Sequence, residues 1–321
     1  MKQFFKIGCL TLCLLLFIGL TFFAGFGLGA IGSAATSSQS LHKQVIGGSG
    51  DDQIALLSLD GVILSAPVNN PFAVGEGVIT PSQVNETLRL ISEDSAIKGL
   101  VLNVNSPGGS AVASDEMYQE IKKLAMKKPV VVLMGDTAAS GGYYISSAGS
   151  YIIANPATVT GSIGVITEIT DIQGLMKKLG LEQETYKSGA FKDLLSPTRK
   201  RTPEEQKMIQ KLLDTTYGLF VSRVAEGRKM DVSKVLELAE GKIYSGKEAQ
   251  EVGLVDALGY QNDALAKAKE LAGIKEATFV DVSTKSFLSS LFSQVKSSNP
   301  LATLLPSLLL SKPGIKFLMQ Y

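Results

Sequence analysis

The amino-acid sequence predicts an α/β protein with one main domain built on a mainly parallel β-sheet. Short apolar segments typical of buried strands alternate with segments of helical spacing over residues 53–281, which is the pattern of βαβ units. With 321 residues, of which 45% are hydrophobic, the chain is long enough to bury a large core. Charged residues make up 19% of the chain, a composition that excludes a mainly disordered protein.

Strand and helix signals alternate through the first half of this domain. Ile54–Leu64 is rich in β-forming residues. A helix is expected from Ser82, a residue type that caps helices, to Glu93. The apolar run Leu100–Val104 predicts a buried strand, and helical spacing follows over Ala113–Lys127.

The same alternation continues through the middle of the chain. Pro129–Met134 has the pattern of a buried strand, and a glycine-rich turn leads into a helix over Ser140–Ala148. Tyr151–Ala154 and Ser162–Ile166 predict two further short strands, and Asp171–Leu179 predicts a helix. These elements extend the parallel sheet by further βαβ units.

The C-terminal part of the domain is mainly helical. Pro203–Arg228 predicts a long helix with acidic residues at its start, where the helix dipole favours them. Two further helices are expected after it, and the sequence contains no internal repeat.

Residues 282–321 form a basic and apolar tail without Asp or Glu. Its apolar stretch Leu301–Leu310 is too short, and too interrupted by Pro306, to span a bilayer. Two interpretations remain open for this tail. It is either an edge element of the fold with a loose end, or an amphipathic surface segment that contacts a membrane or a partner.

The N-terminal segment predicts a membrane anchor. Residues 7–32 carry no charged side chain, and at about 1.5 Å per helical residue this run exceeds the roughly 30 Å of a bilayer core. Lys2 and Lys6 lie in residues 1–6, which the positive-inside rule keeps in the cytoplasm, so the later residues are expected on the extracytoplasmic side. Small residues after the run leave a cleaved signal peptide as the alternative. Residues 33–52, rich in Ser and Gly, predict a flexible tether.

Composition excludes several kinds of chemistry. Lys and Arg total 31 against 30 for Asp and Glu, a net charge of +1. This balance gives no electrostatic reason to expect nucleic acid as a partner. The only histidine, His42, lies in the predicted tether, and the only cysteines, Cys9 and Cys13, lie in the predicted anchor. The predicted domain therefore lacks the residues that a Ser-His-Asp triad, cysteine catalysis or zinc hydrolysis would need. A hydrolase of this composition needs Lys or a carboxylate as base, and Ser, Thr or water as nucleophile.

Three glycine-containing loops follow predicted strands. They are Asn105–Gly109, Ala138–Tyr144 and Thr160–Gly164. Each loop alone is typical of an ordinary turn, and Ser140 alone is typical of a helix cap. Their occurrence at successive strand ends, where ligand sites of open α/β sheets lie, indicates a site. Ser140 is then a candidate nucleophile, and the Gly141 N–H beside it is a candidate donor to an oxyanion.

The base is best sought in the polar segment Tyr186–Asp193. A lysine there is ordinarily a solvated surface charge. It becomes a base at neutral pH only where desolvation or nearby cations lower its pKa from about 10.4. Phe191 and its apolar neighbours are candidates for the apolar surroundings that would desolvate such a lysine.

Four segments taken together resemble the signal peptide peptidase A family. They are Ser106–Gly109, Ala139–Tyr144, Thr160–Val165 and Ser188–Asp193. The similarity covers about residues 53–260 and includes Leu254–Gly259 near its end. It implies a ClpP/crotonase-type fold and a membrane-anchored serine protease with a Ser/Lys dyad. The single copy of the domain is similar to the short form of the family.

The resemblance also implies residue roles. Ser140 matches the nucleophile and Lys192 the general base, while Ser162 matches the hydroxyl that orients the lysine amine. Lys187 is the alternative base, although the Gly-x-x-Lys pattern of the family favours Lys192. Two backbone N–H groups would bind the oxyanion, those of Gly109 and Gly141.

The resemblance further implies a ring-shaped homo-oligomer whose dyad is shared between neighbouring subunits. The implied substrates are remnant signal peptides and similar apolar, extended peptides, and no metal or nucleotide cofactor is needed. Two other functions stay open. A crotonase-like enzyme acting on acyl thioesters is disfavoured by the predicted export anchor. A non-catalytic membrane scaffold of the same fold is disfavoured by the intact Ser140, Lys192 and Ser162.

Overall fold

The structure is a computed structural model and describes residues 41–66 and 77–283. Its central sheet has the order β1-β11-β2-β5-β6-β7-β10, with β8 paired to both β6 and β9. The strands of this sheet are β1 His42–Gly48, β2 Gln53–Asp60, β5 Ile97–Ser106, β6 Val130–Ala139, β7 Tyr151–Ala154, β8 Val159–Gly161, β9 Ile243–Ser245, β10 Ala257–Leu258 and β11 Thr278–Ser283. A separate two-stranded pair joins β3 Val62–Ile63 to β4 Val78–Ile79.

Most of the sheet is parallel, as the alternation of strand and helix signals predicts. Antiparallel pairing is limited to β1 with β11 and β9 with β8 among the described strands. Parallel neighbours need crossover connections, whose helices cover the sheet and bury its strands. Accordingly Leu100–Leu102 of β5 and Val130–Val132 of β6 are fully buried. The α/β class and the mainly parallel sheet are confirmed.

Helices cover both faces of the sheet. They are α2 Pro81–Glu93, α3 Ala111–Ala125, α4 Gly141–Ser146, α5 Gln173–Leu179, α6 Pro203–Arg228, α7 Val232–Leu238, α8 Gly246–Glu251 and α9 Gln261–Leu271. One buried cluster packs α2, α3, α4 and part of α6 against Leu100 and Leu102. A second cluster packs α9 against Val101 and Val131. Because successive side chains of a strand point to opposite faces, the two clusters lie on opposite sides of the sheet.

Strand β1 corrects the prediction of a flexible tether over residues 33–52 for its described part, residues 41–52. His42–Gly48 pairs with β11, so that His42 lies opposite Ser283 and Val45 lies opposite Val280. The partner strand is at the other end of the domain in sequence, and local composition carries no signal of such a pairing. The predicted anchor over residues 7–32 and all but the first two residues of the predicted tail lie outside the described residues. Within residues 41–66 and 77–283, no helix has the length and apolarity that crossing a bilayer requires.

Two predictions in the second half of the domain were wrong. A strand was expected at Ser162–Ile166, but β8 ends at Gly161. Gly161 and Ser162 have φ angles of +76° and +49°, and such left-handed backbone interrupts an extended chain. Three helices, α7, α8 and α9, follow Arg228 in the described chain instead of the two expected.

Helix α6 has its predicted bounds, Pro203–Arg228. Its start is a capping box, in which the Thr202 hydroxyl accepts from the Glu205 N–H and the Glu205 carboxylate accepts from the Thr202 N–H. Pro203 occupies the first turn, where its missing N–H costs nothing. These local signals explain why the start of the helix was predictable.

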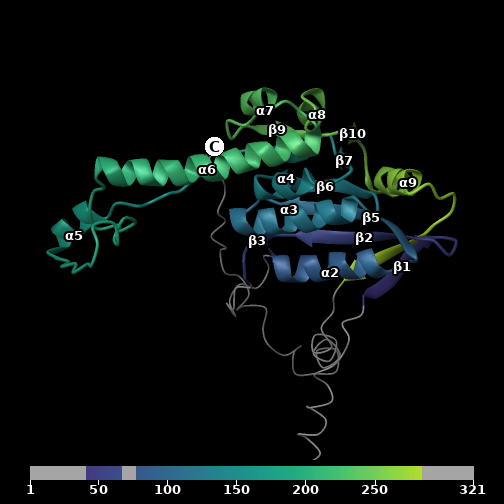
Figure 1. Cartoon of the computed structure of the whole chain (residues 1–321), viewed down its shortest axis with the longest axis horizontal. Coiled ribbons are helices and arrows are strands. Elements are labelled where there is room, and N and C mark those ends of the chain that lie inside the picture. The colour runs from purple at the N-terminus through teal and green to yellow at the C-terminus, as the bar shows by residue number, and fades with distance from the viewer. Residues whose placement is uncertain (1–40, 67–76, 284–321) are drawn as a thin grey trace, which may run out of the picture. The chain divides into compact units, whose positions relative to one another are not determined.

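Residues 166–212, here called the arm, carry α5 and the first ten of the 26 residues of α6. Figure 1 shows both extending beyond the sheet. Apart from the buried Glu205, every residue of the arm is half-buried or exposed. Several of its exposed residues are large and apolar, namely Ile166, Leu175, Leu179, Leu181, Leu195, Met208 and Leu212. Exposed apolar surface of this kind is typical of a contact with another protein chain.

Asp256 ties the end of α6 to the sheet. Its carboxylate accepts hydrogen bonds from both terminal nitrogens of Arg228, at 2.9 and 2.6 Å, and from the Ile152 N–H at 2.7 Å. The Arg228 side chain is only 8% exposed. Asp256→Ala is therefore expected to lower the free energy of unfolding by about 3 kcal/mol, because it leaves a buried guanidinium unpaired. Urea denaturation, with Asp256→Asn as the milder variant, measures the loss; an unchanged midpoint would contradict this role.

Candidate active site

Ser140 lies on the sharp turn that joins β6 to α4. Its backbone has φ +53° and ψ −119°, an uncommon conformation for a residue with a Cβ. Its side chain makes no capping hydrogen bond, and within the described chain its hydroxyl has no hydrogen-bond partner. The residue is half-buried. A free hydroxyl on a strained strand-to-helix turn is the arrangement expected of a serine nucleophile.

The glycines of the first loop lie directly against this turn. A Cβ built on Gly108 would be 2.8 Å from the Ser140 Cβ and 2.6 Å from the Gly141 nitrogen. A Cβ built on Gly141 would be 3.3 Å from the Gly109 nitrogen. The close approach of these two loops therefore depends on glycine at each position.

The N–H groups of Gly109 and Gly141 are available to a ligand. Gly141 is the first residue of α4, where the N–H has no acceptor within the helix. Around Gly109, the bonds to Ile63 run from Ile63 N–H to the Gly108 carbonyl and from Ser110 N–H to the Ile63 carbonyl. No described group accepts from the Gly109 N–H. Both predicted oxyanion donors are thus beside Ser140.

The third loop reaches the same turn. Ala138 and Ala139 of β6 pair with Thr160 and Gly161 of β8, and the Ser140 N–H donates to the Gly161 carbonyl at 2.9 Å. Ser162 follows directly, and its N–H donates to the Lys242 carbonyl at 2.7 Å. Pairing between neighbouring strand ends therefore brings Ser162, the residue after Gly161, to the same edge of the sheet as Ser140.

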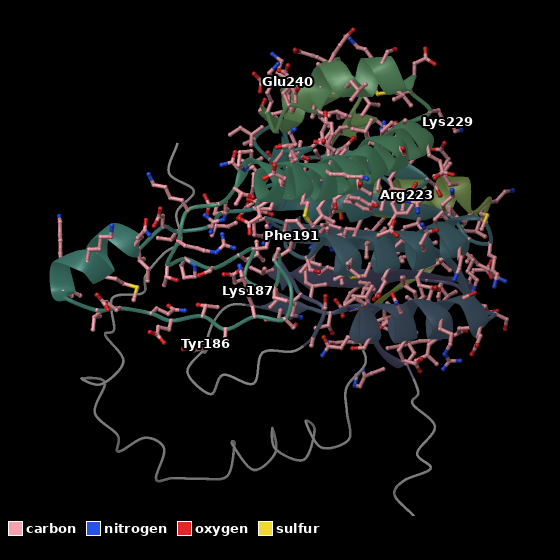
Figure 2. All side chains as sticks on the ribbon, turned by 60° about the vertical axis from the view of Figure 1, so that its left-hand side comes forward. Tyr186, Lys187, Phe191, Arg223, Lys229 and Glu240 are labelled. Carbon is pink, nitrogen blue, oxygen red and sulfur yellow. The ribbon has the colours of Figure 1, made fainter. Side chains whose placement is uncertain are left out.

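Lys192 is not part of this cluster within one chain. It is exposed on the arm, and its backbone N–H donates to the Gly189 carbonyl at 3.2 Å. No hydrogen bond of the described residues joins it to Ser140 or Ser162. The alternative base, Lys187, lies on the same segment as Tyr186 and Phe191 (Figure 2). It donates to the Asp193 carboxylate at 2.7 Å and to the Ala190 carbonyl at 3.0 Å. The Lys187 amine is therefore already bound within the loop, whereas no described residue binds the Lys192 amine, so the contacts favour Lys192 over Lys187.

Comparison with known proteins decides the family. The model of peptidase family S49 matches residues 122–275. An Enterococcus faecium protein described as a signal peptide peptidase SppA is 42% identical over 251 residues, which are 78% of this chain and 71% of that protein. The chain belongs to peptidase family S49.

Other relatives agree with this family. The chloroplastic serine protease SPPA of Arabidopsis thaliana is 39% identical over 241 residues, 74% of this chain and 35% of that protein. Protease 4 of Salmonella typhi is 39% identical over 224 residues, 70% of this chain and 35% of that protein. This chain thus spans about a third of those two relatives. A solved ClpP1 variant from Listeria monocytogenes is 17% identical, covers 65% of this chain and 94% of its own, and has a TM-score of 0.43.

As a member of family S49, the protein is a serine protease. The matched stretch 122–275 includes Ser140, Gly141, Ser162 and Lys192, and it begins after Gly109. The Asp256 that anchors Arg228 also lies within it.

A polar network behind the nucleophile helix was missed from the sequence. The Tyr144 hydroxyl donates to the Asp115 carboxylate at 2.8 Å, and Arg223 Nε donates to the same oxygen at 3.0 Å. Burial, reinforced by the bond to Asp115, raises the pKa of Tyr144. The Tyr118 ring lies edge-on to Tyr144, with centroids 5.6 Å apart, and under the Arg223 guanidinium at 5.2 Å. The network links α3, α4 and α6, whose residues are far apart in sequence.

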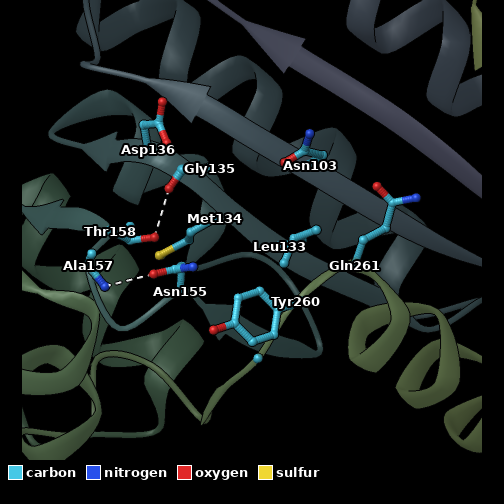
Figure 3. Close-up of a pocket in the computed structure, with 11 residues that line it drawn as sticks. Asn103, Leu133, Met134, Gly135, Asp136, Asn155, Ala157, Thr158, Tyr260 and Gln261 are labelled. Atoms are coloured by element: carbon cyan, nitrogen blue, oxygen red, sulfur yellow. Dashed lines mark hydrogen bonds between the residues drawn. The ribbon is translucent and has the colours of Figure 1, made fainter.

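A cavity of about 510 Å³ opens on β6 ahead of the Ser140 turn (Figure 3). The first part of β6 pairs with β7 and its last part pairs with β8, and the cavity lies between these two pairings. Asp136 and Tyr260 are among its lining residues. The Thr158 hydroxyl donates to the Gly135 carbonyl at 2.7 Å, a bond between two residues that line the cavity. None of the predicted site residues lines this cavity, so it is distinct from the Ser140 cluster.

Proposed function

We propose that the protein is a membrane-anchored endopeptidase that cleaves apolar, extended peptides, such as remnant signal peptides, through a Ser140/Lys192 dyad. The observation that carries this proposal is the Ser140 hydroxyl on its strained turn, beside the N–H groups of Gly109 and Gly141, with none of the three bonded to another described residue. Family membership supplies the reaction class, peptide hydrolysis by a serine enzyme.

The chemistry follows from these groups. The neutral amine of Lys192 takes the hydroxyl proton as Ser140 Oγ attacks the peptide carbonyl carbon. The N–H groups of Gly109 and Gly141 stabilise the resulting oxyanion. The lysinium then protonates the leaving amine as the C–N bond breaks, which leaves an acyl-enzyme. The regained amine activates water, which hydrolyses the ester and releases Ser140.

The length of α6 favours a dyad shared between subunits. The loop that carries Lys192 is bonded to Glu205 at the start of α6 through Asp193 and Arg199. The nucleophile helix α4 is bonded to Arg223 near the other end of α6 through Asp115. Glu205 and Arg223 lie roughly 27 Å apart along the helix, at about 1.5 Å per residue. A lysine side chain cannot bridge such a separation, so a neighbouring subunit is the better source of Lys192.

The exposed apolar surface of the arm supports the same assembly. Leu175, Leu179 and Met208 lie 56%, 63% and 41% exposed in the single chain, and a subunit interface would cover them. Contact with a neighbour would also desolvate Lys192, which favours the neutral amine that the mechanism requires. A ring of such subunits above a membrane would admit unfolded chains and exclude folded ones. Cleavage would then fall on extended segments.

Mixing two inactive variants tests the shared dyad. We expect Ser140→Ala chains and Lys192→Ala chains to be inactive alone and to regain part of the parent peptidase activity when co-assembled. A site is complete wherever a Lys192→Ala chain supplies Ser140 and its Ser140→Ala neighbour supplies Lys192. Hydrolysis of a short apolar peptide, measured on assemblies verified to contain both chains, gives the readout. Absence of any recovery would contradict a site completed between subunits.

A further inference from the structure

Arg199 forms a bridge within the arm between the loop of Lys192 and the start of α6. Its Nε and Nη2 donate to the two Asp193 carboxylate oxygens at 2.8 and 2.7 Å. Its Nη1 and Nη2 donate to the two Glu205 carboxylate oxygens at 2.8 and 2.5 Å. One guanidinium therefore pairs bidentately with two carboxylates, a geometry that a planar fork of donors can satisfy and an ammonium cannot.

The second carboxylate is firmly placed in the fold. The Glu205 side chain is only 2% exposed and closes the capping box of α6 through the Thr202 N–H at 2.8 Å. Hydrogen bonds from Arg199 and Thr202 lower the pKa of Glu205 to about 2, and those from Arg199 and Lys187 place the pKa of Asp193 well below its usual range. Both carboxylates are thus charged wherever the enzyme would work. The bridge therefore ties a loop to a rigid helix end.

Turn hydrogen bonds, such as those from the Lys192 N–H to the Gly189 carbonyl and from the Ser196 N–H to the Asp193 carbonyl, hold the rest of the loop. Residues 182–202 contain no helix or strand, and Asp193 is the residue directly after Lys192. We propose that Arg199 is a positioning residue, which holds Lys192 at the place where a neighbouring Ser140 can use its amine. Asp193 has a second effect, because it also binds the Lys187 ammonium and keeps that amine away from the site. This inference rests on the proposed function, since it assigns a role toward the Ser140/Lys192 dyad.

Directed placement of an Arg199→Gln substitution in mixed assemblies tests the proposal. In a mixture of Ser140→Ala and Lys192→Ala chains, only the Ser140→Ala chain donates Lys192. Arg199→Gln on that chain is expected to lower the recovered kcat by about 10- to 100-fold, the cost of a misplaced reacting group. The same substitution on the Lys192→Ala chain is expected to change it less than about twofold. Equal losses from both placements would mean that Arg199 supports assembly alone and would overturn the proposal.

Substitution in the otherwise intact chain gives a second readout. Arg199→Gln is expected to lower kcat with little change in KM, and Arg199→Lys is expected to restore little, since one ammonium cannot hold both carboxylates. Lys200→Gln, at the neighbouring exposed cation, is the matched control and should match the parent enzyme. Full activity of Arg199→Gln would overturn the proposal. This second experiment needs no mixing of chains. A failure of complementation therefore counts against the shared dyad, and the intact-chain variants still decide the role of Arg199.

Discussion

Ser140→Ala is expected to lower kcat for an apolar peptide by about 10⁴- to 10⁶-fold, the usual cost of removing a serine nucleophile. The fold should be unaffected. An N-cap serine ordinarily contributes about 1 kcal/mol through its side chain, but the Ser140 hydroxyl caps nothing. Alanine also keeps the Cβ, so the strain of a φ angle of +53° is the same in both proteins. Peptide hydrolysis and thermal unfolding measure the two effects.

A matched serine provides the control for this variant. The Ser222 hydroxyl donates to the Gly218 carbonyl within α6 and is exposed, so Ser222→Ala should retain activity. Parent-like hydrolysis by Ser140→Ala would exclude Ser140 as the nucleophile. A large fall in its unfolding temperature would mean that the hydroxyl has a structural partner outside the described residues.

Gly108→Ala is expected to lower kcat by about 10²- to 10³-fold, as the loss of an oxyanion donor does. Gly108 has a φ angle of +104°, where a side chain is strained. Its new methyl group would lie 2.6 Å from the Gly141 nitrogen and 3.1 Å from the Ala139 carbonyl oxygen. Both are backbone atoms, so the two loops must move apart and the Gly109 and Gly141 N–H groups no longer converge.

Another glycine separates this effect from a general loss of flexibility. Gly218 lies inside α6, and a Cβ built there meets nothing within 4 Å. Gly218→Ala should therefore keep the parent activity and stabilise the helix, by up to about 1 kcal/mol. The readout is kcat together with the urea midpoint for both variants. Equal kcat values for Gly108→Ala and the parent would contradict an oxyanion site built from these loops.

Most of the Ser140 cluster could be predicted because its signals are local. A buried apolar run that ends in small residues and glycine predicts both the strand and the turn after it. The elements β5, α3, β6 and α4 overlap the ranges predicted from these patterns, although β6 continues beyond Met134 to Ala139. Parallel pairing then brings the strand ends to one edge of the sheet, which is how Gly109, Ser140 and Ser162 come together.

The errors and omissions depend on contacts between distant residues. No local feature of His42–Gly48 indicates its pairing with β11, and composition alone suggested a tether. Asp115, Tyr144 and Arg223 come from three different helices, so their network becomes visible only once α3, α4 and α6 are packed. The role of Arg199 depends on where its two carboxylate partners sit in space. The sequence shows only that charges of both signs are close together there.

The antiparallel pairing of β1 with β11 places His42 opposite Ser283. The polypeptide therefore enters and leaves the domain at one paired position, where the start of β1 faces the end of β11. Any segment that precedes residue 41 and any that follows residue 283 share a single point of attachment, at the outer margin of the sheet. A circular permutant that joins Ser283 to His42 by a short linker, and is opened in another surface loop, should keep the same strand order.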